Sequence, residues 1–287
     1  MENITQIAQI DEINAALPIT VPKTTTPRGE HRSRFAKPFS ILAVLLIWQA
    51  VAILNQLVAK PFYNPLLFPA PFDILKAAWG LIQTGDLQRN TISSLMRIIV
   101  GLLLATPIGI LLGIGVARIR WIENIAEPII ELLRPVPTLA LLPLFVLWFG
   151  IGESSKVAFI AYSCFFVIFT TTMLGVRNVD PVLLRAAQSL GLKGFKLYRF
   201  VILKSAFPDI MVGFRLGLSV GFLVIVASEF IAADTGLGYL INYSRTYFRV
   251  DQMLVGAAVI GILGLVTNYA LLAVEQRIFS WRPTSER

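Results

Sequence analysis

The sequence has very little of the side-chain chemistry that enzymes use. Of its 287 residues, one is cysteine, one is histidine and only 15% are charged. Cys164 falls in an apolar stretch, where it is a small buried hydrophobic residue, and His31 falls in a polar one. A single cysteine excludes an internal disulfide, and a zinc hydrolase needs several clustered ligands. We therefore predict neither a metal site nor a catalytic cluster.

Sequence motifs for nucleotide or acyl chemistry are also missing. The chain has no phosphate-binding loop of the form G-x-x-x-x-G-K-[ST], no G-x-S-x-G elbow and no His-Glu-x-x-His. We expect no enzyme activity and no cofactor in this chain, so energy for any active process must come from a partner.

Apolar residues are abundant, at 56% of the chain, which exceeds what a soluble domain of this length could bury. A bilayer-spanning helix needs about 20 mostly apolar residues. Gly109 and Gly113, spaced as G-x-x-x-G, favour close packing of one such helix. The sequence predicts an all-α polytopic membrane protein with about six spans. Five stretches are clear: Phe39 to Val58, Ile92 to Val116, Val157 to Val176, Ile210 to Ala232 and Met253 to Ile278.

The remaining stretch, Ile125 to Gly150, is irregular. Its beginning is charged and it contains several prolines, each of which removes a backbone donor. We predict a kinked span whose first part lies partly at the membrane interface. The prolines are Pro128, Pro135, Pro137 and Pro143. The last three, with Gly150 and Gly152, are either bends that let a pore-lining span move or plain structural breaks.

Lysine and arginine are unevenly divided between the two sides that six spans define. Sixteen fall on one side: Lys23, Arg28, Arg32, Arg34, Lys37, Arg118, Arg120, Arg177, Arg185, Lys193, Lys196, Arg199, Lys204, Arg277, Arg282 and Arg287. Six fall on the other side: Lys60, Lys76, Arg89, Lys156, Arg245 and Arg249. The positive-inside rule makes the larger group, and with it both termini, cytoplasmic. This accounts for most of the net charge of +8 without a nucleic-acid partner.

The segments outside the spans have different compositions. Residues 1–38 are polar and basic and predict a flexible cytoplasmic arm, because the apolar stretch that comes next is too long for a cleaved signal. Residues 39–282 form the membrane domain and 283–287 a cytoplasmic tail. On the external side, Pro71 and Asp73 precede an amphipathic stretch with Trp79. We interpret it as an interfacial helix or a packed loop.

A polar, basic segment, Asp180 to Pro208, interrupts the apolar pattern. Asp180 can cap a helix that begins at Pro181, and Gly191 can end it in the left-handed conformation, which gives about nine helical residues. A second helix is predicted from Lys193 to Leu203. The segment is either an elbow that docks in a groove of a soluble partner or an amphipathic loop on the inner leaflet.

A family resemblance bears on this choice. Ala186 and Ala187, then Gly191, then Val201-Ile202-Leu203 resemble the EAA loop of ABC importer permeases. The stretches Leu141 to Ala161, Val201 to Leu218 and Ala227 to Ile241 are similar to the nitrate, sulfonate, taurine and bicarbonate branch, so the resemblance covers nearly everything after residue 39. The glutamate of the family motif falls on Arg185 and its final proline on Lys204.

The resemblance implies a type I importer permease in the bacterial inner membrane. Two such subunits, expected to be a homodimer, line a pore within membrane lipid. Two cytoplasmic ATPase subunits bind ATP and magnesium and grip the coupling loop, residues 180–208, and an external binding protein delivers the substrate. The residues expected to couple to the ATPase are Arg185, Ala186, Ala187, Gly191, Phe195 and Tyr198.

Polar residues at membrane depth are costly and are therefore candidates for the pore or gate. Each has a structural alternative: the arginines near a headgroup layer, the hydroxyls on helix backbone, and the glutamate in a pair with an arginine. An unpaired glutamate would repel an anionic cargo. The candidates are Arg97, Thr171 within the run Thr170 to Thr172, Arg215, Ser228 and Glu229.

The cargo expected from the resemblance is an aliphatic sulfonate or taurine, with nitrate, nitrite or bicarbonate as the alternative. Pyrimidine-like vitamin precursors also fall within the broad family. A different class, an ATP-independent secondary transporter or channel, would show inverted repeats or paired broken helices. The sequence shows no convincing internal repeat.

Overall fold

The computed structural model describes residues 36–58, 62–133 and 135–278. It divides the chain into a unit Met1–Ile47 and a main unit Trp48–Arg287. The predicted arm lies almost wholly outside the described residues, and the predicted tail lies entirely outside them. The main unit contains the coupling segment and every pore candidate.

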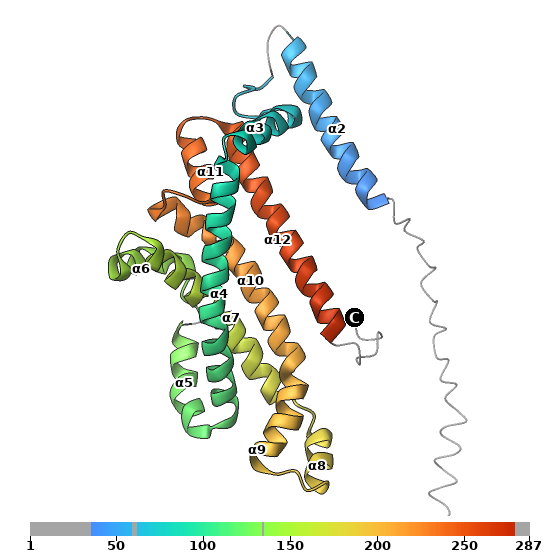
Figure 1. Cartoon of the computed structure of the whole chain (residues 1–287), viewed down its shortest axis with the longest axis vertical. Helices are drawn as coiled ribbons and strands as arrows, with labels where there is room; N and C mark the ends of the chain where they lie inside the picture. Colours follow the sequence, from blue (N-terminus) through green and yellow to red (C-terminus); the bar gives the residue numbers. More distant parts are fainter. Residues whose placement is uncertain (1–35, 59–61, 134, 279–287) are drawn as a thin grey trace, which may run out of the picture. The chain divides into compact units, whose positions relative to one another are not determined.

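The described residues form helices joined by short connections, as predicted (Figure 1). The helices are α2 (Ala36–Leu57), α3 (Pro71–Gln83), α4 (Asp86–Arg118), α5 (Arg120–Leu133), α6 (Leu142–Phe149), α7 (Glu153–Arg177), α8 (Pro181–Ser189), α9 (Gly194–Leu197), α10 (Leu203–Ala232), α11 (Leu237–Thr246) and α12 (Val250–Ile278), with a 3₁₀ turn η1 (Thr138–Leu141) and a π-helical turn η2 (Tyr198–Ile202).

In the described part of the chain, four helical segments are long and apolar enough to span a bilayer: α4, α7, the continuous segment Gly194–Ile231 and α12. The apolar part of α2, Leu42–Leu57, is shorter than a full span. The irregular stretch, predicted to be one kinked span, instead forms α5 and the η1–α6 segment, bent by 90° from each other. Counted as one span, this pair brings the total to five. The six-span count therefore stays a prediction.

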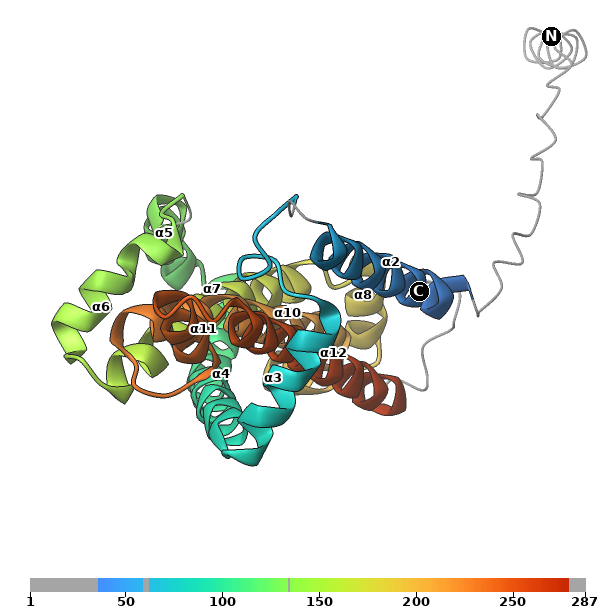
Figure 2. The same cartoon turned by 90° about the horizontal axis from the view of Figure 1, so that it is seen from above.

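Helix α7 is the centre of the main unit, because it packs along both α4 and α10. Ile160, Cys164 and Ile168 form one fully buried face of α7, and the Cys164 thiol donates to the Gly217 carbonyl of α10 at 3.1 Å. Helices α5 and α6 lie on one side of this bundle and α12 on the other (Figure 2).

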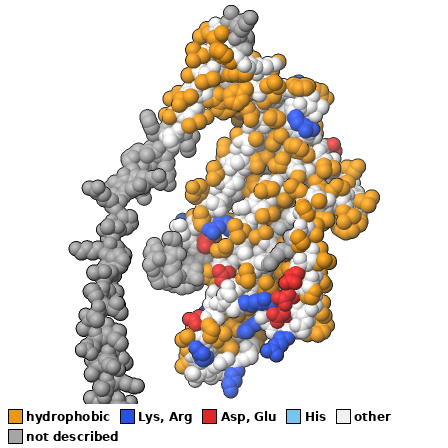
Figure 3. Space-filling model, turned by 180° about the vertical axis from the view of Figure 1, so that it is seen from behind, with side chains coloured by type: hydrophobic (Ala, Val, Ile, Leu, Met, Phe, Trp, Pro, Cys, Tyr) orange, Lys and Arg blue, Asp and Glu red, His pale blue; other side chains and the backbone are white. Residues whose placement is uncertain are grey.

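Two polar or mixed clusters show how the three central helices run. Ser94 near the start of α4 meets Glu229 near the end of α10, whereas Ile114 near the end of α4 packs with Ile202, directly before α10. Val176 near the end of α7 belongs to the same cluster as Ile114 and Ile202. Helices α4 and α7 are thus parallel and α10 is antiparallel to both. The end with α8 and α9 is the one predicted to be cytoplasmic, and Lys and Arg side chains gather there on the face shown in Figure 3.

The opposite end of the main unit is closed by α3 and α11. The segment that we predicted to be external is a helix, not a packed loop. Pro71 begins α3, and the Asp73 carboxylate accepts a hydrogen bond from the Ala70 amide at 3.3 Å. Leu81 of α3 is buried against α11 and α12, while Trp79 is 62% exposed. This exposure agrees with the predicted interfacial position of Trp79.

Helix α7 approaches α4 closely at Gly109 and Gly113, which have no side chains. A Cβ atom on Gly113 would collide with the Phe169 carbonyl and with Thr172, and one on Gly109 would crowd Ile168. Small residues let helix backbones approach closely where lipid supplies no hydrophobic driving force. The predicted G-x-x-x-G contact is therefore made with α7.

We expect Gly113→Ala to lower the free energy of unfolding by about 1–3 kcal/mol, because the backbone of α7 must move to make room. Thermal unfolding of the purified protein in detergent measures this change. Gly261→Ala is the matched control, since a Cβ there meets nothing within 4 Å. Equal stability of the two variants would contradict the packing argument.

Candidate functional site

Helix α8 forms as the sequence predicts. The Asp180 carboxylate accepts from the Val182 amide at 2.7 Å, Pro181 is the first residue, and Gly191 has a φ of 83°. A carboxylate cap, a proline that needs no amide partner and a left-handed glycine are local signals for the two ends of a helix. The nine-residue helix Pro181–Ser189 is the result.

The second predicted helix differs from what we expected. Residues 193–203 were predicted to form a short helix separate from the span that begins at Ile210, but the chain is helical from Gly194 to Ile231. Pro208 lies inside α10. The helix continues because Ile202 and Ala206 are buried against the bundle, which offsets the one backbone donor that Pro208 lacks.

Burial divides the predicted coupling residues into two groups. Arg185, Ala186, Gly191 and Phe195 are exposed, and the Phe195 side chain is 74% exposed. Ala187, in contrast, is buried within the chain, and the hydroxyl of half-buried Tyr198 is buried. Ala187 and the Tyr198 hydroxyl are therefore turned inward, whereas Val182, Leu183 and Ala186 of α8, and Leu190 directly after it, are exposed to a partner.

The inner face of the coupling segment packs on the ends of the central helices. Leu184 and Tyr198 contact a buried cluster that includes Val176, Ile202 and Ala206. The Arg118 guanidinium, at the end of α4, lies 5.9 Å from the centre of the Tyr198 ring. Leu184 is thus the side chain of α8 that connects this helix to the ends of α4, α7 and α10, and close-packed interiors transmit strain.

At the other end of the same helices, two of the predicted pore candidates form a buried ion pair. Arg97 Nη1 lies 2.6 Å from Glu229 Oε1, and both side chains are buried. Glu229 also accepts hydrogen bonds from the Ser94 hydroxyl and, at 2.7 Å, from the Gly238 amide. The alternative in which Glu229 pairs with an arginine is the one observed.

Glu153 completes this cluster, which joins four elements. Its carboxylate accepts from Arg97 Nε and Nη2 at 2.6 and 2.7 Å and from the buried Lys156 ammonium at 3.0 Å. Arg97 also donates to the Thr235 carbonyl and hydroxyl. The cluster thereby ties α4 and α7 to the end of α10 and to the connection before α11. We call Arg97, Glu153, Lys156 and Glu229 the outer clasp.

Every donor of the Arg97 guanidinium is used. Arginine has five N–H groups, and the structure gives Arg97 bonds to Glu229, to Glu153 twice and to Thr235 twice. No donor is left for an anionic cargo in this conformation. The outer clasp is therefore a connection between helices and not an open anion site.

The other three pore candidates also have protein partners. The Ser228 hydroxyl donates to the Ile225 carbonyl at 2.9 Å, and the Thr171 hydroxyl donates to the Val167 carbonyl at 2.8 Å. Arg215 pairs with Glu275 of α12 at 3.1 Å, in a partly exposed position. The structure thus brings Arg97 and Glu229 together, whereas the side chains of Thr171, Arg215 and Ser228 bond to other groups.

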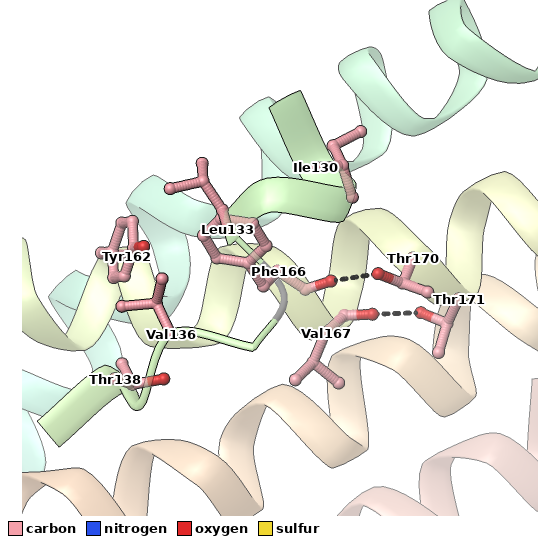
Figure 4. Close-up of a pocket in the computed structure, with 9 residues that line it drawn as sticks. All are labelled: Ile130, Leu133, Val136, Thr138, Tyr162, Phe166, Val167, Thr170 and Thr171. Carbon is pink, nitrogen blue, oxygen red and sulfur yellow. Dashed lines mark hydrogen bonds between the residues drawn. The ribbon is translucent and has the colours of Figure 1, made fainter. Parts of the chain in front are cut away.

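Thr171 lines a pocket of about 330 Å³ between α7 and the α5–η1 break (Figure 4). One wall consists of Tyr162, Phe166, Val167 and Thr170 of α7, and the opposite wall of Ile130, Leu133, Val136 and Thr138. Four polar residues of the two sites were not predicted from the sequence: Tyr162 and Thr138 here, and Glu153 and Lys156 in the outer clasp. Each is a polar residue in or beside an apolar stretch, which is the signal that could have found them.

Comparison with known proteins identifies the family. The model of the family described as "Binding-protein-dependent transport system inner membrane component" matches residues 105–280. The chain belongs to this family. It is a multi-pass membrane permease, and the match gives no support to the alternative of an ATP-independent transporter or channel.

Known relatives of this permease cover most of its length. The taurine transport system permease protein TauC of Escherichia coli is 39% identical over 84% of this chain and 87% of TauC. The putative aliphatic sulfonates transport permease protein SsuC of Escherichia coli is 33% identical over 90% of this chain and 96% of SsuC. The riboflavin transport system permease protein RibX of Chloroflexus aurantiacus is 31% identical over 90% of this chain and 96% of RibX.

We expect Arg97→Met to destabilise the permease by about 3–5 kcal/mol, because the buried Glu229 carboxylate loses its partner. The double variant Arg97→Met, Glu229→Met should regain part of this loss, since no unpaired charge remains. Thermal unfolding in detergent measures both.

The control is Arg215→Met, which breaks a partly exposed pair and should change stability by no more than about 1 kcal/mol. If Arg97→Met were as stable as Arg215→Met, the outer clasp would not hold the helices together.

Proposed function

We propose that this permease, as a homodimer, forms the translocation path of an ATP-driven importer for a small organic sulfonate such as taurine or an alkanesulfonate. The names of TauC and SsuC support the cargo, and the family description supports the dependence on a binding protein. RibX, at 31% identity, is named for riboflavin, so the greater identity of TauC carries the choice of cargo.

The partners of the proposed importer follow from what the chain lacks. It contains no ATP-binding motif, so two cytoplasmic ATPase subunits would bind ATP and magnesium. An external binding protein would deliver the cargo to the end of the molecule that carries α3 and α11. This assignment of sides rests on the charge bias, with both termini and α8 in the cytoplasm.

The observation that carries the coupling role is that α8 is exposed on one side and buried on the other. Its outer surface offers Leu183 and Ala186, with Leu190 directly after the helix 83% exposed. On its inner surface Ala187 is buried and Leu184 packs on the bundle. An apolar surface with a small residue at its centre suits a groove on another protein. Closure of the ATPases on ATP would thus push α8 and, through it, the central helices.

The outer clasp has a place in the same mechanism. It ties α4, α7 and α10 together at the end far from α8, so these helices would rotate as one body when α8 moves. A conformational equilibrium shifts only when a partner binds one state better than the other. In this proposal, ATP-bound ATPases favour the outward-facing state through α8, and the rigid bundle transmits that preference to the external side.

We expect Ala186→Trp to abolish ATP-driven uptake, or to lower it more than about tenfold, because the bulky ring prevents close approach of the ATPase. Residue 186 is exposed, so the subunit itself should fold normally. The measurements are uptake into proteoliposomes that hold the complete transporter, and copurification of the ATPase. Ala270→Trp on α12 is the matched control and should transport normally; uncoupling by both variants or by neither would contradict the role of α8.

The cargo is tested through the cognate binding protein and the reconstituted importer together. We expect calorimetry to detect binding of taurine or an alkanesulfonate, and the complete importer to take up the same compound with ATP. Binding of nitrate or bicarbonate without any sulfonate would overturn the proposed cargo and leave the coupling role intact.

A further inference from the structure

The pocket of Figure 4 lies beside the middle of α7, at the depth of the bilayer centre if α7 spans the membrane. Tyr162, Phe166 and Thr170 recur every four residues, so they share one face of this helix. The face opposite carries Ile160, Cys164 and Ile168, which are buried against α4 and α10. Helix α7 therefore separates the packed core from this pocket.

The other wall of the pocket contains backbone that is not α-helical. Pro135 and Pro137 lack amide donors, and the chain between α5 and η1 makes the short-range bonds Val136 N to Leu133 O and Ala140 N to Pro137 O. Irregular backbone at membrane depth is tolerated where it lines a water-filled cavity or is buried in protein. The residues of this break line a pocket of about 330 Å³, and the second test below measures whether water reaches it.

The four hydroxyl groups of the pocket are not equivalent. Those of Thr170 and Thr171 donate to the Phe166 and Val167 carbonyls of their own helix, each at 2.8 Å. Those of Tyr162 and Thr138 have no hydrogen-bond partner among the residues that the structure describes. Tyr162 and Thr138 therefore supply the two donors that are available to a molecule in the pocket.

Among the residues that the structure describes, the remaining lining residues are apolar and none of the lining residues is charged. Ile130, Leu133 and Val136 on one side and Phe166 and Val167 on the other would suit an aliphatic chain. A head group with several acceptor oxygens would suit the two free hydroxyls. Nitrate and bicarbonate have no aliphatic part, so the pocket favours an organic anion over an inorganic one.

We propose that this pocket is a station on the translocation path, where Tyr162 and Thr138 donate hydrogen bonds to the sulfonate oxygens and the apolar walls contact the aliphatic chain. The proposal rests on the proposed function, because it requires an organosulfonate cargo. Neutral donors suit a transport path, since binding must be weak enough for the cargo to leave.

The first test compares uptake by the complete transporter in proteoliposomes, with saturating amounts of cargo-loaded binding protein. We expect Tyr162→Phe to lower the rate about tenfold, which corresponds to about 1.4 kcal/mol for one lost hydrogen bond. The matched control is Tyr269→Phe, which makes the same change on a side chain that is 66% exposed on α12 and should transport normally.

The second test measures whether the pocket is wet and on the path of the cargo. In a Cys164→Ala background, the Thr138→Cys variant is treated with 2-sulfonatoethyl methanethiosulfonate, a water-soluble thiol reagent that carries the proposed head group. We expect labelling of the introduced thiol, detected by mass spectrometry, and slower labelling while the transporter is turning over sulfonate. The unaltered protein, in which Cys164 is 0% exposed, should not be labelled.

The outcomes separate this proposal from the proposed function. If the unaltered importer takes up sulfonate while Tyr162→Phe transports normally, the role of the Tyr162 hydroxyl is wrong. If the thiol introduced at position 138 is not labelled, or is labelled equally with and without turnover, the pocket is not on the path. If the unaltered importer takes up no sulfonate at all, the cargo assignment fails and this proposal fails with it.

Discussion

The contact of α7 with α4 and α10 is the constraint on which the rest of the structure depends. Within lipid, helices gain little from burial of apolar surface and associate through close packing and polar contacts. Glycines of α4 allow the backbone of α7 to approach, and the outer clasp adds charged hydrogen bonds at one end. At their other end, the same three helices contact residues 180–208, the predicted coupling loop. The two ends are therefore connected through one packed bundle.

The packing of these helices distinguishes structural polar residues from candidates for cargo contact, which the sequence did not separate. Arg97 and Glu229 stood together with Thr171 as pore candidates, yet the two charged residues neutralise each other and use their hydrogen bonds within the protein. We propose the pocket beside α7 for the cargo and the exposed apolar residues of α8 for the ATPase. The buried charged pair bonds one helix to another, whereas the described polar residues that line the pocket are neutral.

The bent pair α5 and η1–α6 shows the limit of span prediction by hydropathy. The prolines in Ile125 to Gly150 correctly indicated a distortion, and we expected a kink within one span. The structure turns by 90° there because Pro135 and Pro137 fall close together and leave no continuous helical ladder. The resulting non-helical backbone is what lines the pocket, so the feature that complicated the span count also made the cavity.

Composition and local residue patterns were enough to predict the apolar helices, the charge bias and the ends of α8, because each depends on residue content or on residues within one helical turn. Tertiary packing was needed to show that Arg97 meets Glu229, 132 residues away, and that Ala187 is buried while Ala186 is exposed. It was also needed to show that the predicted helix at residues 193–203 continues into α10. These outcomes depend on which helix faces approach each other, and a single sequence records helical periodicity but not the partner of each face.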